Sequence, residues 1–312
     1  MPAGALKANQ RAGSDGKATG RPRMTDSARP VLVLGSGGRL GRLLRAVWPD
    51  DVPVIWQSRW AEQGMVECEF MTAPSGLRSL MSQVGAVICL AGVTDDFARR
   101  TGAPYSDNSD IALACLKAAS DSGCHRVFLL SSAAVYGRAT GVLRETDTCD
   151  PVSPYGEAKR AMERTALRFA ATEPLEVCCL RLGNVAGADA ALGNWKPGAE
   201  MDVFVSGKTP QRSYVGAQSL ARILVALVRA KHVPQTLNVA APVPIAMGDL
   251  LDAAGCAWKS RPAPISAIER VHLDTSLLQK FYEFAPREVT ASNLVAQWQK
   301  AVGQLSAPRV AR

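Results

Sequence analysis

A tyrosine and a lysine four residues apart are the side chains of this sequence best placed to move a proton. Tyr155 and Lys159 stand in the segment Y-G-E-A-K, directly after Pro154. On a helix, residues four apart lie on one face, and Ser153 followed by Pro154 is typical of a helix start. A phenol normally titrates near ~10, and an ammonium one turn away favours the phenolate. The spacing therefore predicts that Tyr155 acts as an acid and base with Lys159 as its partner.

Two serines at the end of an apolar segment supply a third polar group. Ser131 and Ser132 follow the strand-like run R-V-F-L-L at 126–130. At the carboxyl end of a parallel strand, where ligands bind in open α/β sheets, Ser132 can hydrogen-bond the reacting oxygen and orient it. Taken singly, a Y-x-x-x-K pair is more often a surface pair, and two serines are more often a turn. Their order along the chain, behind a glycine-rich turn, favours catalysis by Ser132, Tyr155 and Lys159.

The glycine-rich turn follows a buried apolar strand. Residues 31–41 are V-L-V-L-G-S-G-G-R-L-G, a G-x-x-G-x-x-G spacing rather than the commoner G-x-G-x-x-G. Between strand and helix, Gly35 permits the turn, Gly38 lets the backbone approach a pyrophosphate, and Gly41 allows close packing. We expect a dinucleotide to be bound by the helix start and by Gly35, Gly37, Gly38, Arg39, Leu40 and Gly41. An oxidised nicotinamide ring beside Tyr155 would accept hydride and further favour the phenolate.

The end of the second strand bears on the choice between NAD and NADP. A preference for NAD requires a carboxylate there, for the ribose 2′-hydroxyl, and this sequence has Gln57, Ser58 and Arg59 instead. A guanidinium without a competing carboxylate suits a 2′-phosphate. We therefore expect NADP to be preferred over NAD, with Gln57 and Arg59 in the cofactor site. The alternative is that Arg59 is a solvated surface residue.

Strand-like and helix-like segments alternate along most of the chain. The expected strands cover residues 31–34, 53–56, 66–70, 86–91, 126–130, 175–182 and 236–240. This alternation predicts an α/β fold, a Rossmann-type doubly wound parallel sheet with a small C-terminal substrate-binding lobe. We expect a dinucleotide-binding domain at 30–185, to which 213–240 return. Residues 186–212 and 241–305 would form the lobe, and 1–29 a disordered basic tail. An organellar transit peptide or a start at Met24 are alternatives for that tail.

Five motifs together resemble those of the extended short-chain dehydrogenases/reductases of the NAD-dependent epimerase/dehydratase type. They are G-S-G-G-R-L-G at 35–41, S-S-A-A-V-Y-G at 131–137, Y-G-E-A-K at 155–159, R-L-G-N-V-A-G at 181–187 and Q-R-S-Y-V at 211–215. The resemblance extends over about residues 30–240. It implies that Ser132, Tyr155 and Lys159 form the catalytic triad, and that Lys159 also hydrogen-bonds the nicotinamide ribose.

The same resemblance implies further cofactor contacts. Ala91 and Gly92 match the cofactor-lining turn after the fourth strand, and Asn108 matches an asparagine of the helix that follows. Glu69 stands near an acidic position that often contacts the adenine. Family analogy also favours a homodimer through the helices after the fourth and fifth strands.

For the substrate, the resemblance implies contacts from two residues. Asn184 matches a substrate-contacting asparagine, and Arg212 matches an arginine that binds the diphosphate in sugar-nucleotide members. We expect an NAD(P)-dependent epimerase, dehydratase or reductase acting on a nucleotide-sugar. Because few residues separate Gly187 from Arg212, an NADPH-dependent carbonyl reductase of a small ketone or aldehyde is the alternative. A non-catalytic dinucleotide sensor would need the glycines but none of the triad.

Composition argues against other classes. The net charge of +8 is concentrated at the ends, since residues 1–29 carry six basic side chains against two acidic ones. Without a basic stripe interleaved with aromatic residues, nucleic-acid binding is not expected. The apolar run 86–91 is far shorter than the ~20 residues of a membrane span, so no membrane partner is expected. The eight cysteines have no metal-ligand spacing. They suit a reducing cytoplasm, and we expect a cytoplasmic protein without a metal site.

Overall fold

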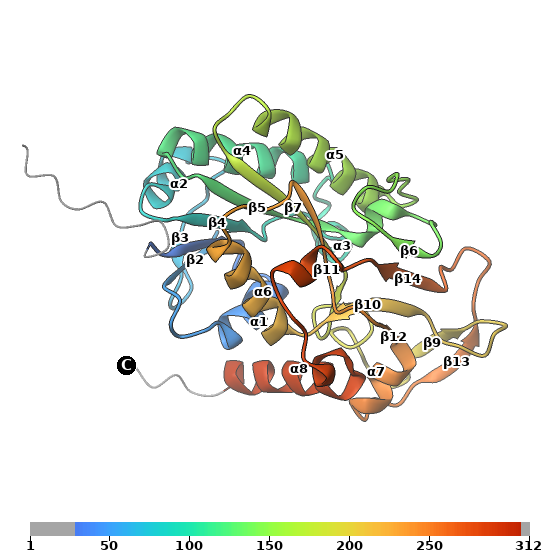
Figure 1. Ribbon diagram of the computed structural model, residues 1–312. Helices are drawn as coiled ribbons and strands as arrows, with labels where there is room; N and C mark the ends of the chain where they lie inside the picture. The colour runs from blue at the N-terminus through green and yellow to red at the C-terminus, as the bar shows by residue number, and fades with distance from the viewer. Residues whose placement is uncertain (1–28, 307–312) are drawn as a thin grey trace, which may run out of the picture.

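A parallel sheet of seven strands forms the centre of the computed structural model, which describes residues 29–306 (Figure 1). In sheet order the strands are β11 (Thr236–Val239), β7 (Glu176–Leu182), β5 (Arg126–Ser132), β4 (Ala86–Cys89), β1 (Val31–Leu34), β2 (Val54–Ser58) and β3 (Val66–Glu67). All neighbouring strands run parallel. The order reverses between β1 and β4, as in a doubly wound sheet. The predicted Rossmann-type fold is confirmed.

Helices cover both faces of this sheet (Figure 1). One face carries α2 (Pro74–Met81), α4 (Asp107–Ser122) and α5 (Pro154–Ala170), and the other carries α1 (Arg39–Val47) and α6 (Ala217–Arg229), with α8 (Ala291–Ser306) packed outside them. Strand residues alternate between the two layers: Leu32 and Leu34 pack towards α2 and α4, whereas Val31 and Val33 pack towards α1 and α6. Because both faces are buried, these strands are continuous apolar runs in the sequence.

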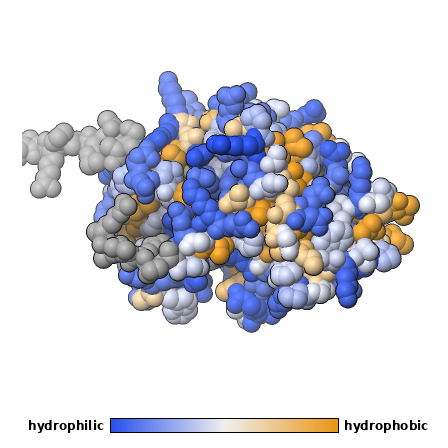
Figure 2. Space-filling view, turned by 90° about the horizontal axis from the view of Figure 1, so that it is seen from below, coloured by the Kyte–Doolittle hydropathy of each residue, from blue (hydrophilic) through white to orange (hydrophobic). Residues whose placement is uncertain are grey.

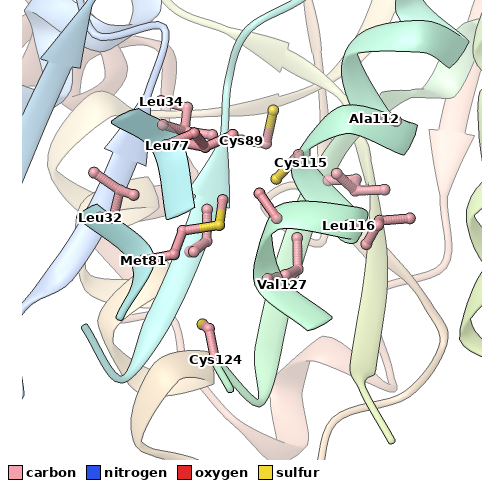
Figure 3. Packing of buried hydrophobic residues seen from close by; sticks show 14 of the residues in the cluster. Leu32, Leu34, Leu77, Met81, Cys89, Ala112, Cys115, Leu116, Cys124 and Val127 are labelled. Atoms are coloured by element: carbon pink, nitrogen blue, oxygen red, sulfur yellow. The ribbon is translucent and has the colours of Figure 1, made fainter. Parts of the chain in front are cut away.

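Cysteines and aliphatic side chains fill the layer between the sheet and helices α2 and α4 (Figure 3). Leu77 and Met81 of α2 and Cys115 of α4 are fully buried there, next to Cys89 of β4. All eight cysteines are free thiols, and six of them are buried. A buried thiol behaves as a small hydrophobe, so these cysteines are part of the core packing.

A second, smaller lobe lies beside the carboxyl ends of the main strands. Its larger sheet has the order β12 (Pro244–Ala246), β10 (Gln211–Val215), β14 (Arg270–Leu273) and β6 (Val142–Leu143), and β8 (Asn184–Val185) also pairs with β10. A two-stranded ribbon joins β9 (Glu200–Val203) to β13 (Lys259–Pro262), and α7 (Met247–Ala253) packs against α8. Segment 30–185 therefore contributes β6 and β8 to the second lobe, whereas α6 and β11 belong to the main domain.

Two local outcomes differ from the sequence expectation or lie outside it. The strand expected at 66–70 ends at Glu67, because Cys68 and Phe70 leave the sheet edge and enter the core beside α2. The basic tail predicted at 1–29 lies outside the described residues, except for Arg29, whose guanidinium donates to the carbonyl of Ser82 at 3.1 Å. Across residues 29–306, none of the helices combines the length and apolar character of a membrane span.

Candidate active site

The glycine loop and the turn after β4 lie against each other where the strand order reverses. Gly35 has a φ of +78°, and a Cβ on it would lie 2.6 Å from the backbone nitrogen of Ala91. A Cβ on Gly41 would lie 2.5 Å from the Cα and the carbonyl oxygen of Ser36. Both positions therefore exclude a side chain. The crevice between the carboxyl ends of β1 and β4 is where open α/β sheets bind ligands.

The start of α1 is open towards a ligand. Gly38 is its N-cap, and no side chain caps the first turn. Arg39 is exposed beside it, and Leu40 and Gly41 complete that turn. Uncapped N–H groups and the positive end of the helix dipole favour an anion. These features, with the two excluded Cβ positions, fit the pyrophosphate of a dinucleotide.

The end of β2 supports the loop in a way that the sequence did not indicate. Gln57 is buried: its side-chain oxygen accepts from Gly35 N at 2.9 Å, and its amide donates to the carbonyl of Cys68 at 2.6 Å. The Gln57 side chain therefore links the glycine loop to Cys68 by hydrogen bonds. Arg59, roughly half exposed, forms an ion pair with Glu69 at 2.8 Å. Arg59 and Glu69 were both expected to contact the cofactor, and in this structure they contact each other.

A carboxylate that sequence reasoning missed lies close to the loop. Glu62 Oε2 would be 3.5 Å from a Cβ on Gly37. The guanidinium groups of Arg42 and Arg45 hold this carboxylate at 3.5 and 3.7 Å. The segment between β2 and β3 shows no periodicity, so only the folded chain reveals the placement of Glu62.

The three residues predicted to be catalytic meet at the carboxyl end of β5. Ser132 ends β5, and its Oγ accepts from the backbone N–H of Ala134 at 3.2 Å. Tyr155 lies in the first turn of α5, hydrogen-bonded to Ser132. Lys159 is buried one turn later, and its Nζ lies 5.8 Å from the centre of the Tyr155 ring. Nζ also donates to the carbonyl of Leu130 at 2.9 Å, which fixes the lysine beneath the phenol.

The start of α5 is positioned by a cap and a close approach. The Ser153 side chain accepts from Gly156 N at 3.1 Å, so it caps the helix as expected. A Cβ on Gly156 would lie 2.6 Å from the carbonyl oxygen of Ala134, in the short helix η2 (Ala133–Tyr136). The missing side chain lets α5 approach the turn after β5, and this approach brings Tyr155 to Ser132.

Burial favours the neutral forms of both Tyr155 and Lys159. It raises the pKa of Tyr155 to about 12, although the hydrogen bond with Ser132 works in the opposite direction. Burial also lowers the pKa of Lys159 to about 8, against the influence of Cys89, Cys179 and Glu163. From the sequence we expected the ammonium, together with an oxidised nicotinamide ring, to lower the phenol pKa. Without the cofactor's charge, desolvation outweighs that ammonium.

The turn after β4 joins the cofactor crevice to the lysine. A Cβ on Gly92 would lie 2.7 Å from Asn108 Oδ1 and 3.2 Å from Lys159 Nζ. Asn108 is buried, accepts from Val93 N at 3.2 Å and donates to the carbonyl of Tyr105 at 3.0 Å. It therefore fastens the start of α4 to the turn, and a side chain at position 92 would be in contact with the Lys159 ammonium.

An aromatic neighbour of the phenol was also missed. The rings of Tyr105 and Tyr155 lie 6.3 Å apart, and the Tyr105 hydroxyl donates to Asp95 at 2.6 Å. Asp95 begins α3 (Asp95–Thr101), which the sequence pattern did not indicate. No spacing connects Tyr105 with the tyrosine fifty positions later, so only packing brings them together.

The two residues expected to contact substrate lie in the second lobe. Asn184 in β8 pairs with Tyr214 in β10. Arg212 donates to three backbone carbonyls, those of Gln211 at 2.8 Å, Ile268 at 2.8 Å and Glu269 at 3.3 Å. No carboxylate pairs with Arg212 anywhere in 29–306. A guanidinium held by neutral carbonyls keeps its positive charge available for an anion.

Two hollows flank the carbonyls that hold Arg212, and Glu269 lines both. One, of about 690 Å³, is mainly apolar, with Phe204, Val205 and Ile265 in its lining. Figure 2 shows hydrophobic residues at the right-hand edge, the side on which Figure 1 places β9 and β13. The other, of about 470 Å³, is lined by Arg138, Lys208 and Arg270 among others. In the described part of the chain, no group of three or more His, Cys, Asp or Glu residues could hold a metal ion.

Comparison with known sequences identifies the family to which this site belongs. The sequence profile of the NAD dependent epimerase/dehydratase family matches residues 31–240, from β1 to the end of β11. The chain belongs to this family. A similar protein is the UDP-glucose 4-epimerase of Azospirillum brasilense, 31% identical over 185 residues that make up 54% of this chain and 53% of that protein. Another is the UDP-glucose 4-epimerase of Lacticaseibacillus casei, 35% identical over 92 residues, 28% of each chain. The matched part thus spans about half or less of these curated relatives.

Solved structures share the whole fold at lower identity. The UDP-glucose 4-epimerase from Brucella ovis in complex with NAD has a TM-score of 0.74 at 19% identity, covering 89% of this chain and 98% of that one. MoeE5 in complex with UDP-glucuronic acid and NAD has a TM-score of 0.71 at 22% identity, with 88% and 99% covered. The arrangement of main sheet and second lobe is therefore common to this chain and these proteins.

Proposed function

We propose that this protein is an NAD(P)-dependent epimerase, dehydratase or reductase that acts on a nucleotide-sugar by hydride transfer. The observation that carries the proposal is the meeting of Ser132, Tyr155 and Lys159 beside Gly92, at the crevice where Gly35 meets Ala91. A sensor of dinucleotides would need the crevice, but it would have no use for a buried lysine beneath a phenol. Membership of the epimerase/dehydratase family and the substrates named for the similar proteins support the same assignment.

Each of the three side chains has a separate task in this proposal. A bound dinucleotide supplies the site that accepts or returns hydride. Ser132 Oγ already accepts a backbone N–H, so its own hydrogen, which is directed to Tyr155 in the free protein, can turn to the reacting oxygen when substrate binds. The Tyr155 oxygen takes the hydroxyl proton of the sugar as the C–H hydride leaves, and it returns that proton in the reverse direction. The Lys159 ammonium stabilises the phenolate and donates to the ribose through the space left by Gly92.

The second lobe provides the features that a nucleotide-sugar requires. We propose that Arg212 binds the diphosphate and that Asn184 contacts the sugar. The apolar hollow beside Phe204 would receive the nucleoside. Replacing Arg212 by Met should raise the Kd for UDP-glucose by about tenfold or more, because a charge-assisted contact is lost. The Kd for the dinucleotide should stay unchanged, and equal weakening of both would contradict this division of roles.

For the cofactor we propose NADP in preference to NAD. In support, β2 ends on Ser58 and is followed by Arg59 rather than by a carboxylate. The Arg59 guanidinium is half exposed, and it can exchange the Glu69 carboxylate for a 2′-phosphate. The carboxylate of Glu62 lies near Gly37 and would by itself disfavour a 2′-phosphate. In this proposal Arg42 and Arg45 neutralise Glu62 and leave Arg59 as the deciding charge.

The Tyr155→Phe variant tests the proposed chemistry. UDP-glucose serves as probe substrate, with NAD or NADP as cofactor. Turnover should fall by about 10²-fold or more, the usual contribution of a positioned acid and base, while the Kd for the dinucleotide stays the same. Wild-type turnover in this variant would overturn the proposal. Ser79→Ala, which removes a hydroxyl from the distant helix α2, serves as the matched control.

The same assay separates the alternative activity. An NADPH-dependent carbonyl reductase of a small ketone or aldehyde would use the same triad, and the short stretch between Gly187 and Arg212 favours it. A reductase consumes the reduced dinucleotide and so lowers its absorbance, whereas an epimerase shows no net change. Net consumption of NADPH with a small ketone, and no conversion of UDP-sugars, would establish the reductase.

Family analogy also supports two properties of the whole protein. We propose a homodimer formed through the outer faces of α4 and α5, measurable as twice the chain mass by light scattering. We further propose a cytoplasmic location, in keeping with six buried free thiols that a reducing compartment would preserve. A monomer at micromolar concentration would contradict the first proposal, and recovery outside the cytoplasm would contradict the second.

A further inference from the structure

A buried ion pair lies directly behind the triad and takes no part in the chemistry proposed above. Glu163 on α5 and Arg181 on β7 are both almost fully buried, and three hydrogen bonds join them: Nη2 to Oε2 at 2.9 Å, Nε to Oε1 at 3.1 Å and Nε to Oε2 at 3.3 Å. Although burial disfavours the charge of Arg181, the hydrogen bonds to Glu163 hold its pKa above the usual value. Removing two charges from water has a large desolvation penalty, so the ion pair contributes little net stability by itself.

The ion pair is the centre of a network that reaches five elements. The Ser131 hydroxyl donates to Glu163 Oε1 at 2.5 Å. On the other side, Arg181 Nη1 donates to the Tyr136 hydroxyl at 3.0 Å, and that hydroxyl donates to Asn238 Oδ1 at 2.8 Å. The network thus joins β5, η2, α5 and β7 and ends on β11. Each of its polar side chains has a partner, which makes the arrangement rigid.

Three consecutive residues of β5 each contact a residue of α5. The Leu130 carbonyl accepts from Lys159, the Ser131 hydroxyl donates to Glu163, and Ser132 is hydrogen-bonded to Tyr155. The three helix residues are spaced four apart and so lie on one helix face. A shift of the helix along the strand would break all three contacts together. The Ser131–Glu163 contact is the one outside the triad, and Arg181 fixes the direction of its carboxylate.

We propose that Glu163 and Arg181 are positioning residues that set the register between β5 and α5, and that Ser131 is their link to the triad. This inference rests on the proposed function, because it concerns the placement of Ser132 against Tyr155. Neither residue touches the reacting atoms. Their effect is expected in kcat, since a displacement of about 1 Å at a reacting centre can cost about 10²-fold in rate, and not in the binding of the dinucleotide.

Ser131→Ala tests the link with the least disturbance of the fold. It removes one hydroxyl and leaves the ion pair in place. Turnover of UDP-glucose should fall by about tenfold, which is less than the loss of about 10²-fold expected for a displacement of about 1 Å. The KM for UDP-glucose and the Kd for the dinucleotide should stay unchanged. Ser120→Ala is the matched control, because Ser120 donates to Glu173 at the same 2.5 Å between α4 and the turn after α5, away from the triad. It should lose comparable stability and keep its kcat.

The double variant Glu163→Met with Arg181→Met separates positioning from the burial of charge. Replacing both members of a buried ion pair with apolar residues often preserves stability. A folded double variant should therefore lose about 10²-fold in kcat with little change in Kd for the dinucleotide. Full kcat in folded Ser131→Ala or in the double variant would overturn the inference, and so would an equal loss in Ser120→Ala. Should Tyr155→Phe keep its turnover, the proposed function itself falls, which is a distinct result.

Discussion

Gly41→Ala tests whether the glycine loop is set by close backbone contacts. Gly41 lies in the first turn of α1, where alanine is favoured over glycine by about 1 kcal/mol on helix propensity. Against this gain, the new Cβ would lie 2.5 Å from Ser36 Cα and 2.7 Å from Ser36 C. These are backbone atoms that cannot rotate away, so the loop must move by about 1 Å. Overpacking of this kind costs about 1–3 kcal/mol.

The control is a helical glycine at which an added Cβ would meet no other atoms. Gly303 lies in α8, and a Cβ there would meet nothing within 4 Å. Gly303→Ala should therefore raise the free energy of unfolding by up to about 1 kcal/mol. The two variants should differ by about 1–3 kcal/mol in urea unfolding without cofactor. The Kd for the dinucleotide should rise by about tenfold or more in Gly41→Ala alone, a factor equivalent to about 1.4 kcal/mol. Equal stabilisation of both variants, with unchanged Kd, would refute the close-contact argument.

Three further expectations concern charge. Lys159→Met should raise the free energy of unfolding at pH 7 by up to about 3 kcal/mol. Since the lysine pKa falls from 10.5 to about 8 on folding, this advantage should shrink as pH rises from 8 to 10.5 in urea titrations, and a constant advantage would be contrary evidence. Arg59→Ala should raise KM for NADPH far more than for NADH. Glu69→Gln should lower KM for NADPH, because it releases the Arg59 guanidinium from its ion pair. Equal effects on both cofactors would count against the NADP proposal. Near-ultraviolet titration against Tyr155→Phe should show the phenol pKa lower with oxidised than with reduced dinucleotide bound, and identical values would contradict a charge effect.

The fold could be predicted because its signals are local. Strands β1, β4, β5 and β7 are largely apolar runs with glycine or serine at or shortly after their carboxyl ends, and buried parallel strands have that pattern. The carboxyl ends of such strands meet at one edge of the sheet. Ser132, Gly35 and Gly92 consequently lie near one another as soon as the strand order is known. Their roles in binding and catalysis remain predictions.

Features of the site that depend on the direction of a side chain were not predictable. Gln57 follows a strand, and nothing in its spacing indicates that its amide turns inwards to Gly35. Glu62 approaches Gly37 from an irregular segment. Arg181 and Glu163 lie eighteen positions apart in different elements and meet only after β7 and α5 have packed. Such contacts follow from tertiary packing, which periodicity does not encode.

The direction of the Tyr155 pKa has a consequence for how the proposed chemistry is controlled. At neutral pH the phenol keeps its proton, because burial raises its pKa to about 12, whereas Lys159, with a pKa of about 8, still carries its charge. One ammonium is thus insufficient to create the base in this desolvated site. In the proposed chemistry, the oxidised nicotinamide ring would supply a second positive charge when bound. The phenolate would then form where a hydride acceptor is present, and the charge of the ring would couple proton removal to hydride transfer.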